Sequence, residues 1–381
     1  MLTVIRPGRL TRVFVFLIAV AVLSAARAGC VLKFGGPETS TPVMSFDEVD
    51  HTNFHVLLQR YVDQRGRVCY SDWAEHCCDV SRLQGYLNYL THVDPTRPAS
   101  KEATLAYYIN AYNALTLWGI LDNYPVVSIQ KLDGEKSCYT IFDDLRLWVG
   151  NRHLSLNGIE NDAVRPMGDP RIHFALVCAA RGCPRLRNEA FQAHCLDGQL
   201  NDNAIEFFSD RNRFHISRLT KKVKISPILK WYREDFGQTD YQVVTTVFRF
   251  LPHEDRCWLA SHPGWKLDHL GYDWGLNDGC PALSVGMGRI PYRAWSKISP
   301  MIAPLMPQSD DEASGNATVP PSATNPPENT WSPENAEPLE LPQPDTWSEP
   351  PVPGEDAPNP DDSPLPLPSA VERPPVPPAG L

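Results

Sequence analysis

The segment Ser100–Pro125, SKEATLAYYINAYNALTLWGILDNYP, decides the fold that we expect for this chain. Its apolar residues occupy nearly every side of the helix that the composition predicts, which is typical of a helix buried inside a domain. Ser100 opens this helix, and Tyr124-Pro125 stops it, because the residue before a proline is pushed out of the helical conformation. We therefore expect the domain to be built around this segment.

Two asparagines interrupt the apolar surface of this helix. Asn110 and Asn113 are three residues apart and so lie on one face. A buried amide without hydrogen-bond partners costs on the order of 1–3 kcal/mol, so both side chains must be bonded. They either brace neighbouring loops or border a polar cavity, and the sequence leaves both interpretations open.

The flanking segments mix helical and extended patterns. Ser45–Glu48 is a capping box before a helix, and Leu145–Leu156 alternates around Gly150-Asn151 as a β-hairpin does. Asn157 then caps a short helix with Glu160 at the box position. The apolar run Ile172–Cys178 is short enough to be a central strand, and helical spacing returns after Pro184. The pattern predicts an α+β fold: a single globular domain, residues 46–285, with the buried central helix packed on a small, mostly antiparallel sheet.

The N-terminal residues 1–29 have the pattern of an export signal. Three arginines precede the apolar run Val13–Ala26, which is too short to span a bilayer comfortably. Cleavage after Ala28 would release a soluble protein, whereas cleavage before Cys30 would leave a lipoprotein acylated on that cysteine. Both alternatives predict a bacterial-type protein that is secreted, periplasmic or attached to the cell envelope. A lipid on Cys30 would be its only membrane contact, and residues 30–45 form a linker.

The C-terminal residues 299–381 differ in composition from the rest. Residues 301–381 hold 22 of the 37 prolines and carry a net charge of −13, against −10 for the whole chain. Such a segment cannot bury enough apolar area to fold, so we expect a disordered, acidic, proline-rich tail, whose partner the sequence does not name. The remaining chain is nearly neutral, which argues against a nucleic-acid surface.

Export changes what the cysteines imply, because thiols tend to pair in an oxidising compartment. If Cys30 carries a lipid, an odd number remains, and at least one thiol stays free or pairs between chains. The ten cysteines are Cys30, Cys69, Cys77, Cys78, Cys138, Cys178, Cys183, Cys195, Cys257 and Cys280.

The stretch RIHFALVCAARGCPRL, from Arg171 to Leu186, holds the candidate site. Gly182 permits an unusual backbone angle before Cys183, and Pro184 suits the first turn of a helix. A thiol at a helix N-terminus has its thiolate stabilised by the backbone N–H groups. We therefore predict Cys183 as a nucleophile, with His173 as its base.

Further residues would complete such a site. Asn110, Asn113 or Glu160 could orient the imidazole, and Asn110 or helix N–H groups could hold an oxyanion. Cys178 is the second sulfur, but on a regular strand it would point away from His173, since the two are an odd number of residues apart.

Two alternatives to a reactive thiol stay open. Cys178 and Cys183 could form a disulfide, or they could join His173 in a metal site, although no second ligand pair with zinc-like spacing is present. His51 and His55 also have a metal-compatible spacing, but we expect them on a solvated helix face. We predict no cofactor and no metal.

Several motifs, in order, carry a family resemblance: YYINAYNALTLWGIL, LSLNGIENDAVRP, GDPRIHFALVCAARGCPRL and GYDWGLND. From about Phe46 to Asp278 the chain resembles the domain of unknown function 547 family. The resemblance implies at best a distant likeness to thiol proteases and no assigned activity.

Two hypotheses of function follow. The first is a thiol-dependent hydrolase or acyl transferase acting on peptide-like amides, with a peptide-like or cell-wall-associated substrate. The second is a non-catalytic envelope module, for binding or structure, held by a Cys178–Cys183 disulfide.

Overall fold

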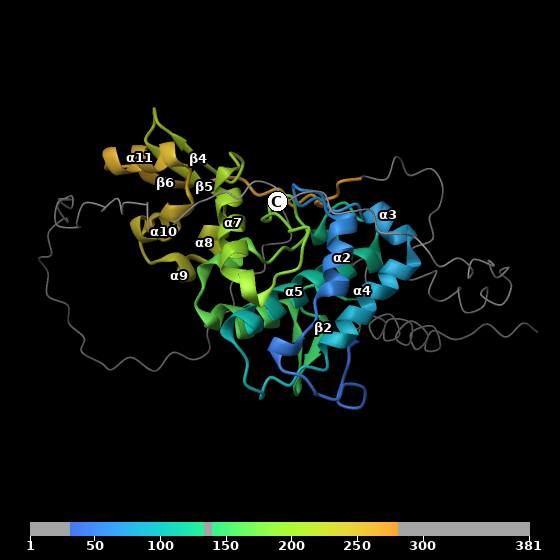
Figure 1. Ribbon diagram of the computed structural model, residues 1–381. Helices are drawn as coiled ribbons and strands as arrows, with labels where there is room; N and C mark the ends of the chain where they lie inside the picture. The colour runs from blue at the N-terminus through green and yellow to red at the C-terminus, as the bar shows by residue number, and fades with distance from the viewer. Residues whose placement is uncertain (1–30, 133–138, 281–381) are drawn as a thin grey trace, which may run out of the picture.

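A computed structural model describes residues 31–132 and 139–280 of the chain (Figure 1). The predicted export signal, the possible lipid on Cys30 and the acidic tail lie outside the described residues. The helices are α2 (Thr52–Tyr61), α3 (Tyr70–Glu75), α4 (Cys77–Leu90), α5 (Lys101–Asn123), α6 (Leu156–Gly158), α7 (Leu196–Ser209), α8 (Ile228–Trp231), α9 (Arg233–Phe236), α10 (Asp240–Val247) and α11 (His253–Ser261). The strands are β1 (Leu32–Phe34), β2 (Leu145–Val149), β3 (Arg152–Ser155), β4 (Phe214–Ser217), β5 (Lys222–Ile225) and β6 (Lys266–His269).

Helix α5 forms the centre of the larger hydrophobic core, as predicted. Nearly all of its residues are buried, and the Ser100 hydroxyl caps it by accepting the backbone N–H of Ala103. In Figure 1 helices α2 to α4 lie on one side of α5, and the segments from α7 to α11 lie on the other. The prediction of a buried central helix is confirmed.

The strands form two small mixed sheets rather than one. In the first, β2 pairs with β1 in parallel and with β3 antiparallel; in the second, β5 pairs with β4 antiparallel and with β6 in parallel. The predicted hairpin is confirmed as β2–β3, with Gly150 at a left-handed φ of 65° in its turn. The α+β class is confirmed, and each sheet contains one parallel and one antiparallel pair.

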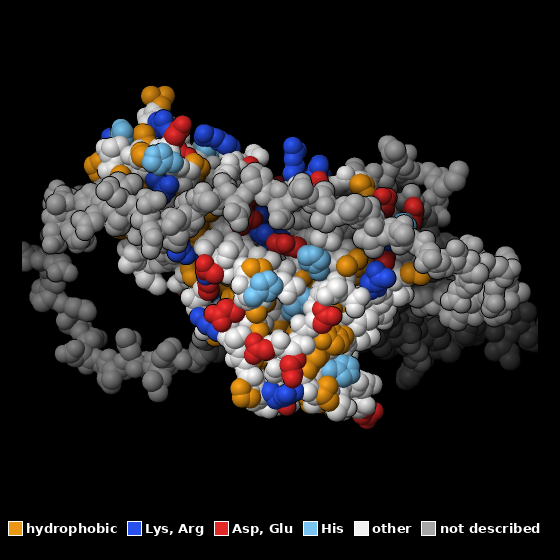
Figure 2. All heavy atoms as spheres, in the orientation of Figure 1, with side chains coloured by type: hydrophobic (Ala, Val, Ile, Leu, Met, Phe, Trp, Pro, Cys, Tyr) orange, Lys and Arg blue, Asp and Glu red, His pale blue; other side chains and the backbone are white. Residues whose placement is uncertain are grey.

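Two hydrophobic clusters stabilise the described part of the chain. The larger surrounds α5, and the smaller joins α7, the second sheet and α8 to α11. Tyr272 packs against both clusters. On the face drawn in Figure 2, acidic and basic side chains are interspersed, as the near-neutral charge of this part of the chain predicts.

Across residues 31–132 and 139–280, no helix is both long enough and apolar enough to cross a bilayer.

The predicted strand Ile172–Cys178 is wrong. Asp169 instead caps a 3₁₀ turn, Pro170–Phe174, by accepting the backbone N–H of Arg171, and Pro170 fits the first position of that turn. Beyond the turn, the side chain of Asn113 bonds the backbone at Ala175 and Val177, which removes those groups from any strand pairing.

The helix start predicted at Cys183-Pro184 is also wrong, whereas the helical spacing that follows it is confirmed as α7. The chain runs on without regular structure to a 3₁₀ turn at Ala193–Cys195, and only then does α7 begin. Asn110 holds this irregular stretch by bonding both the N–H and the carbonyl of Phe191.

Two helix caps differ from the prediction in detail. The capping box of Ser45 is present, but it caps a single 3₁₀ turn, Phe46–Glu48. Helix α2 begins later in the chain. Ser155, not Asn157, caps α6 by accepting the N–H of Gly158.

One disulfide is present among the described cysteines. It joins Cys69, at the start of α3, to Cys280 across 211 residues, and so fixes the end of the described chain to the helical side. The remaining described cysteines are free thiols: Cys77, Cys78, Cys178, Cys183, Cys195 and Cys257.

Candidate functional site

A cavity of about 650 Å³ lies where the two hydrophobic clusters meet. Tyr112 of α5 and the β2–β3 hairpin border it on one side, and Trp231, Tyr232 and Tyr272 border it on the other. A volume of this size suits a small ligand or a short segment of a larger one.

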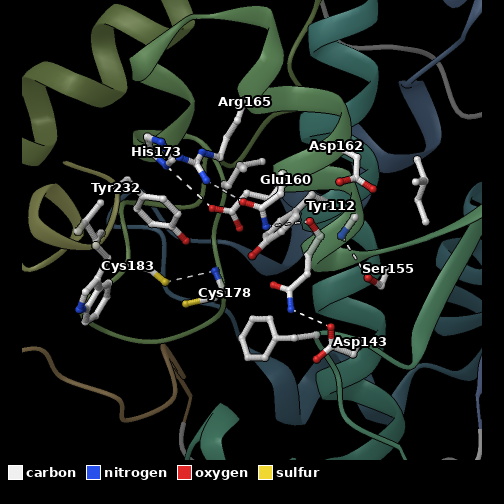
Figure 3. A pocket seen from close by; sticks show the side chains of 18 of the residues that line it. Tyr112, Asp143, Ser155, Glu160, Asp162, Arg165, His173, Cys178, Cys183 and Tyr232 are labelled. Atoms are coloured by element: carbon white, nitrogen blue, oxygen red, sulfur yellow. Dashed lines mark hydrogen bonds and ion pairs between the residues drawn. The ribbon is translucent and has the colours of Figure 1, made fainter. Parts of the chain in front are cut away.

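Two free sulfurs face this cavity (Figure 3). The Sγ atom of Cys183 accepts the backbone N–H of Cys178 at 3.2 Å. It also lies 3.1 Å from the hydroxyl of Tyr272, whose oxygen is 3.6 Å from the Sγ of Cys178. The structure therefore has no Cys178–Cys183 disulfide, contrary to the second hypothesis.

The two thiols differ in acidity. The hydrogen bond with Cys183, followed by burial, raises the pKa of Cys178 well above its usual value. Burial raises the pKa of Cys183, but hydrogen bonds from Cys178, Tyr272 and two backbone N–H groups outweigh it, so the pKa is lowered overall. Cys183 is therefore the sulfur that ionises first, because its thiolate has donors on several sides.

These donors replace the helix N-terminus that the sequence predicted for Cys183. The loop that carries the thiols is held against the chain after β6, where Arg181 and Gly182 donate their N–H groups to the carbonyls of Gly275 and Asp273 at 2.8 and 2.9 Å. Gly182 has no left-handed φ, so the expected unusual angle is absent. A Cβ there would lie 2.9 Å from the ring of Tyr272, so glycine permits the close approach that brings the hydroxyl to the sulfurs.

His173 lies at the same cavity, but its ring does not contact a sulfur. Nε2 is 2.6 Å from a carboxylate oxygen of Asp235, and Nδ1 is 4.0 Å from one of Glu160. The ring also stacks on Tyr232, with 4.0 Å between centroids. His173 therefore does not hold the position of the base predicted for Cys183, because both ring nitrogens face carboxylates.

Asp235 joins Arg165 and His173, two residues that line the cavity. Arg165 bonds both of its carboxylate oxygens, at 2.7 and 3.0 Å. Burial raises the pKa of Asp235, but hydrogen bonds from His173 and Arg165 lower it to about 2. Asp235 is thus a permanent anion that fixes the orientation of the imidazole.

Glu160 is the other carboxyl group on this side, and Figure 3 shows it between His173 and Tyr112. It is buried on a π-helical turn, Ile159–Val164, a geometry that is rare and frequent at functional sites. Burial raises its pKa, although His173 and a hydrogen bond from Tyr232 act in the opposite direction. Burial therefore favours the protonated form of Glu160, which is the direction that a general acid requires.

The two asparagines of α5 do not line the cavity. Asn110 bonds the backbone of Phe191, and Asn113 bonds that of Ala175 and Val177. The bracing interpretation is the one that the structure supports. The predicted roles of Asn110 and Asn113 in orienting the imidazole or holding an oxyanion have no geometric basis.

The metal alternatives are not supported either. The one set of three potential ligand atoms that lie within 4.8 Å of one another in the described residues is Cys69, Asp72 and Cys280, and two of these form the disulfide. His51 is not on a solvated face: it is buried, and its Nδ1 is 2.7 Å from the Tyr86 hydroxyl.

Sequence reasoning missed several residues of the site. Tyr232 and Asp235 fall in a charged helical stretch whose pattern is typical of a solvated surface. Arg165 gave no local signal. Tyr272 belongs to GYDWGLND, a stretch that carried the family resemblance without indicating a role.

A family model described as "Protein of unknown function, DUF547" matches residues 96–208. No curated protein and no solved structure matches the chain. The matched range contains α5, the hairpin, Glu160, His173 and both sulfurs, whereas Asp235 and Tyr272 lie beyond it. The resemblance inferred from the motifs is confirmed over residues 96–208, which match the model of the DUF547 family.

Proposed function

We propose that this protein is an exported thiol-dependent hydrolase or acyl transferase that acts on peptide-like amides bound in the cavity, with Cys183 as its nucleophile. The observation that carries the proposal is the environment of Cys183. Its sulfur faces the cavity and receives hydrogen bonds from the Cys178 N–H and the Tyr272 hydroxyl, which favour the thiolate. Export is supported by the N-terminal sequence pattern and by the Cys69–Cys280 disulfide, a bond that persists in oxidising compartments.

The chemistry does not need His173 as a base. The Cys183 thiolate attacks the amide carbonyl carbon, the C–N bond breaks, and the acyl group stays on Cys183 as a thioester. The leaving amine takes up a proton, for which the protonated carboxyl of Glu160 is the donor in this proposal. Water, or an acceptor nucleophile in a transferase, then attacks the thioester and releases the thiolate, while Glu160 recovers the proton.

His173 is a positioning residue in this scheme. Its Nε2 is held by Asp235, and its Nδ1 side faces Glu160, so the imidazole fixes the carboxyl that carries the proton. Tyr232 stacks on the imidazole and donates to Glu160, which restricts that carboxyl further.

A second function is favoured by the contact between the two thiols. Cys178 donates a hydrogen bond to Cys183, and the pair differs in acidity as a thiolate and its resolving thiol do. In a dithiol oxidoreductase, Cys183 would attack a substrate disulfide and form a mixed disulfide. Cys178 would then displace the second substrate thiol, which leaves Cys178–Cys183 oxidised and the substrate reduced by two electrons.

Site-resolved alkylation of the mature protein tests the proposal. Iodoacetamide modification, followed by mass spectrometry from pH 6 to 10, should label Cys183 with an ionisation midpoint below that of exposed Cys257. Cys183→Ala should abolish this fast phase, and Cys178→Ala should retain it with a midpoint shifted upward. An inert Cys183 in a folded protein whose Cys257 reacts normally would exclude both functions.

A peptide map under non-reducing conditions separates the two functions. After incubation with oxidised glutathione, a dithiol oxidoreductase gives a Cys178–Cys183 crosslink. A hydrolase or transferase instead gives an acylated Cys183 with an activated acyl amide, in Cys178→Ala as well as in the wild type.

A further inference from the structure

The first sheet carries a row of cations on the face that leads into the cavity. The register pairs Lys33 of β1 with Arg146 of β2, and Arg146 with Ser155 of β3. Residues paired in this way share one face of a sheet. The opposite face is apolar and buried, with Leu145, Leu147 and Leu154 in the core. Of these three paired residues, Arg146 and Ser155 line the cavity, and His153 of β3 lines it as well.

This arrangement opposes the stability of the sheet. Like charges on directly paired residues destabilise neighbouring strands, and Lys33 and Arg146 are such a pair. Neither forms an ion pair with a carboxylate of residues 31–132 or 139–280. The Nε of Arg146 donates to the Asp143 carbonyl, which leaves the remaining N–H groups of its guanidinium without a carboxylate among those residues.

His153 adds an unsatisfied polar group beside this row. Its Nδ1 is buried and has no hydrogen-bond partner in the described part of the chain. Burial, followed by the charges of Lys33 and Arg146, lowers the pKa of this imidazole, so the ring is neutral at neutral pH and can donate or accept one bond. A buried polar atom without a partner is the exception in folded proteins and requires an explanation.

Besides Glu160, the carboxylates of Asp143 and Asp162 line the same cavity and weigh against an anion. Asp143 accepts a hydrogen bond from the side chain of Asn157 at 2.9 Å, and Asp162 lies 3.9 Å from Arg152. Asp143 therefore has a hydrogen-bond donor and Asp162 has an ion-pair partner, whereas neither Lys33 nor Arg146 has a carboxylate partner within the described ranges. Arg165 also lines the cavity, but its guanidinium already donates to Asp235 and Asn161 and offers an anion little.

We propose that Arg146, with Lys33, Ser155 and His153, forms a subsite for the anionic group of the ligand, an oxyanion such as a carboxylate or a phosphate. As a substrate subsite it rests on the proposed function: the acyl group would lie at Cys183, and the same molecule would extend to its anionic end at the sheet. Arg146 can hold either oxyanion through paired N–H groups. The Ser155 hydroxyl, which accepts the Gly158 N–H, still has its own proton to donate. The inferred substrate class is therefore an amide that carries a negative charge.

Binding of small probes tests the subsite without requiring catalysis. The mature chain with Cys183→Ser is titrated with N-acetylglycine, which has one amide and one carboxylate, with N-acetylglycinamide as its uncharged match, and with inorganic phosphate. Affinity is measured by calorimetry or by NMR. We expect saturable binding of N-acetylglycine or phosphate and none of the uncharged amide, and the tighter anion identifies the source of the charge.

Substitutions then locate the site. Arg146→Gln should weaken binding of the anion at least about tenfold, as expected for loss of a charge-assisted bond, and Lys33→Gln should weaken it less. Arg218→Gln makes the same change of charge on the distant, exposed β4–β5 turn and should leave affinity unchanged. Arg146→Lys, which keeps the charge, should fall between Arg146→Gln and the wild type.

The outcomes distinguish this inference from the proposed function. Equal affinity in Arg146→Gln and the wild type, or no saturable binding of either anion, overturns the anion subsite even if Cys183 is reactive. Anion binding that depends on Arg146, together with an inert Cys183, supports the subsite and removes the thiol chemistry.

Discussion

The hydroxyl of Tyr272 lies within hydrogen-bonding distance of both sulfurs of the site, 3.1 Å from Cys183 and 3.6 Å from Cys178. The two cysteines are close in sequence, but the tyrosine comes from the chain after β6, some ninety residues later. The acidity of Cys183 therefore depends on a contact that forms only when these two distant segments pack together.

Tyr272→Phe removes this hydroxyl and keeps the ring. We expect the alkylation of Cys183 at pH 7 to slow at least about tenfold, because a hydrogen bond to a charged group contributes about 1.5 kcal/mol or more. The full pH profile of alkylation should shift upward. Tyr241→Phe is the control, since that side chain is exposed on α10, and it should leave the profile in place.

Asp235→Asn leaves Arg165 and His173 without their shared anion. We expect a loss of roughly 2–3 kcal/mol in the free energy of unfolding, because breaking a largely buried pair leaves a charge uncompensated. Urea denaturation measures the loss. Glu234→Gln is the matched control: it is adjacent, 86% exposed and 3.7 Å from Arg165, and it should change stability by less than about 0.5 kcal/mol. Equal effects of the two substitutions would contradict the structure.

Asn113→Asp keeps the shape of the side chain but replaces its amide with a carboxylate, which has no N–H₂ group to donate. The Ala175 carbonyl then loses its donor, and a charge is buried, so we expect a loss of about 3 kcal/mol or more. Thermal unfolding followed by circular dichroism would measure it. Asn212→Asp, at an exposed turn, should have almost no effect. A small loss at position 113 would mean that the loop before Cys178 is not held by this amide.

Gly182→Ala places a methyl group 2.9 Å from the Tyr272 ring and 3.0 Å from the Asp273 nitrogen. One of the two loops must move, so we expect slower Cys183 alkylation and a destabilisation of about 1–3 kcal/mol. Gly198→Ala, within α7 and with open space around its Cβ, should instead stabilise the protein by about 0.5–1 kcal/mol. A loss of stability in Gly182→Ala and a gain in Gly198→Ala would show that the loss comes from the close contact at position 182, not from the replacement of a glycine as such.

His51 should make stability depend on pH. Burial lowers its pKa from 6.5 to about 4, so the unfolded chain binds a proton that the folded chain does not take up until the pH approaches 4. Stability is therefore complete above pH 6.5 and falls by up to about 3 kcal/mol as the pH drops to 4. Urea titrations at pH 7.5 and 4.5 should show this loss of stability in the wild type. His51→Asn should lose less stability between the two pH values, because it lacks the contribution of this histidine.

Some elements of the fold could be predicted because their signals are local. Ser100 and Tyr124-Pro125 mark the ends of α5, and the Gly150-Asn151 turn marks the hairpin, since each depends only on backbone preferences of a few residues. The segment after α6 could not be predicted in this way. Its apolar run has the composition of a strand, but side-chain amides from α5 take its backbone hydrogen bonds, and no local pattern shows that.

The sequence by itself determined the resemblance to the DUF547 family, the α+β class and the buried central helix, and it predicted Cys178, Cys183, His173 and Glu160 as site residues. The tertiary structure decided which of these meet. It turned His173 toward Asp235 and Glu160, gave Cys183 its donors through Tyr272, and assigned the two asparagines to the backbone of the loops. The physical reason is that acidity and hydrogen bonding depend on distances of about 3 Å, and residues far apart in the chain reach such distances only through packing.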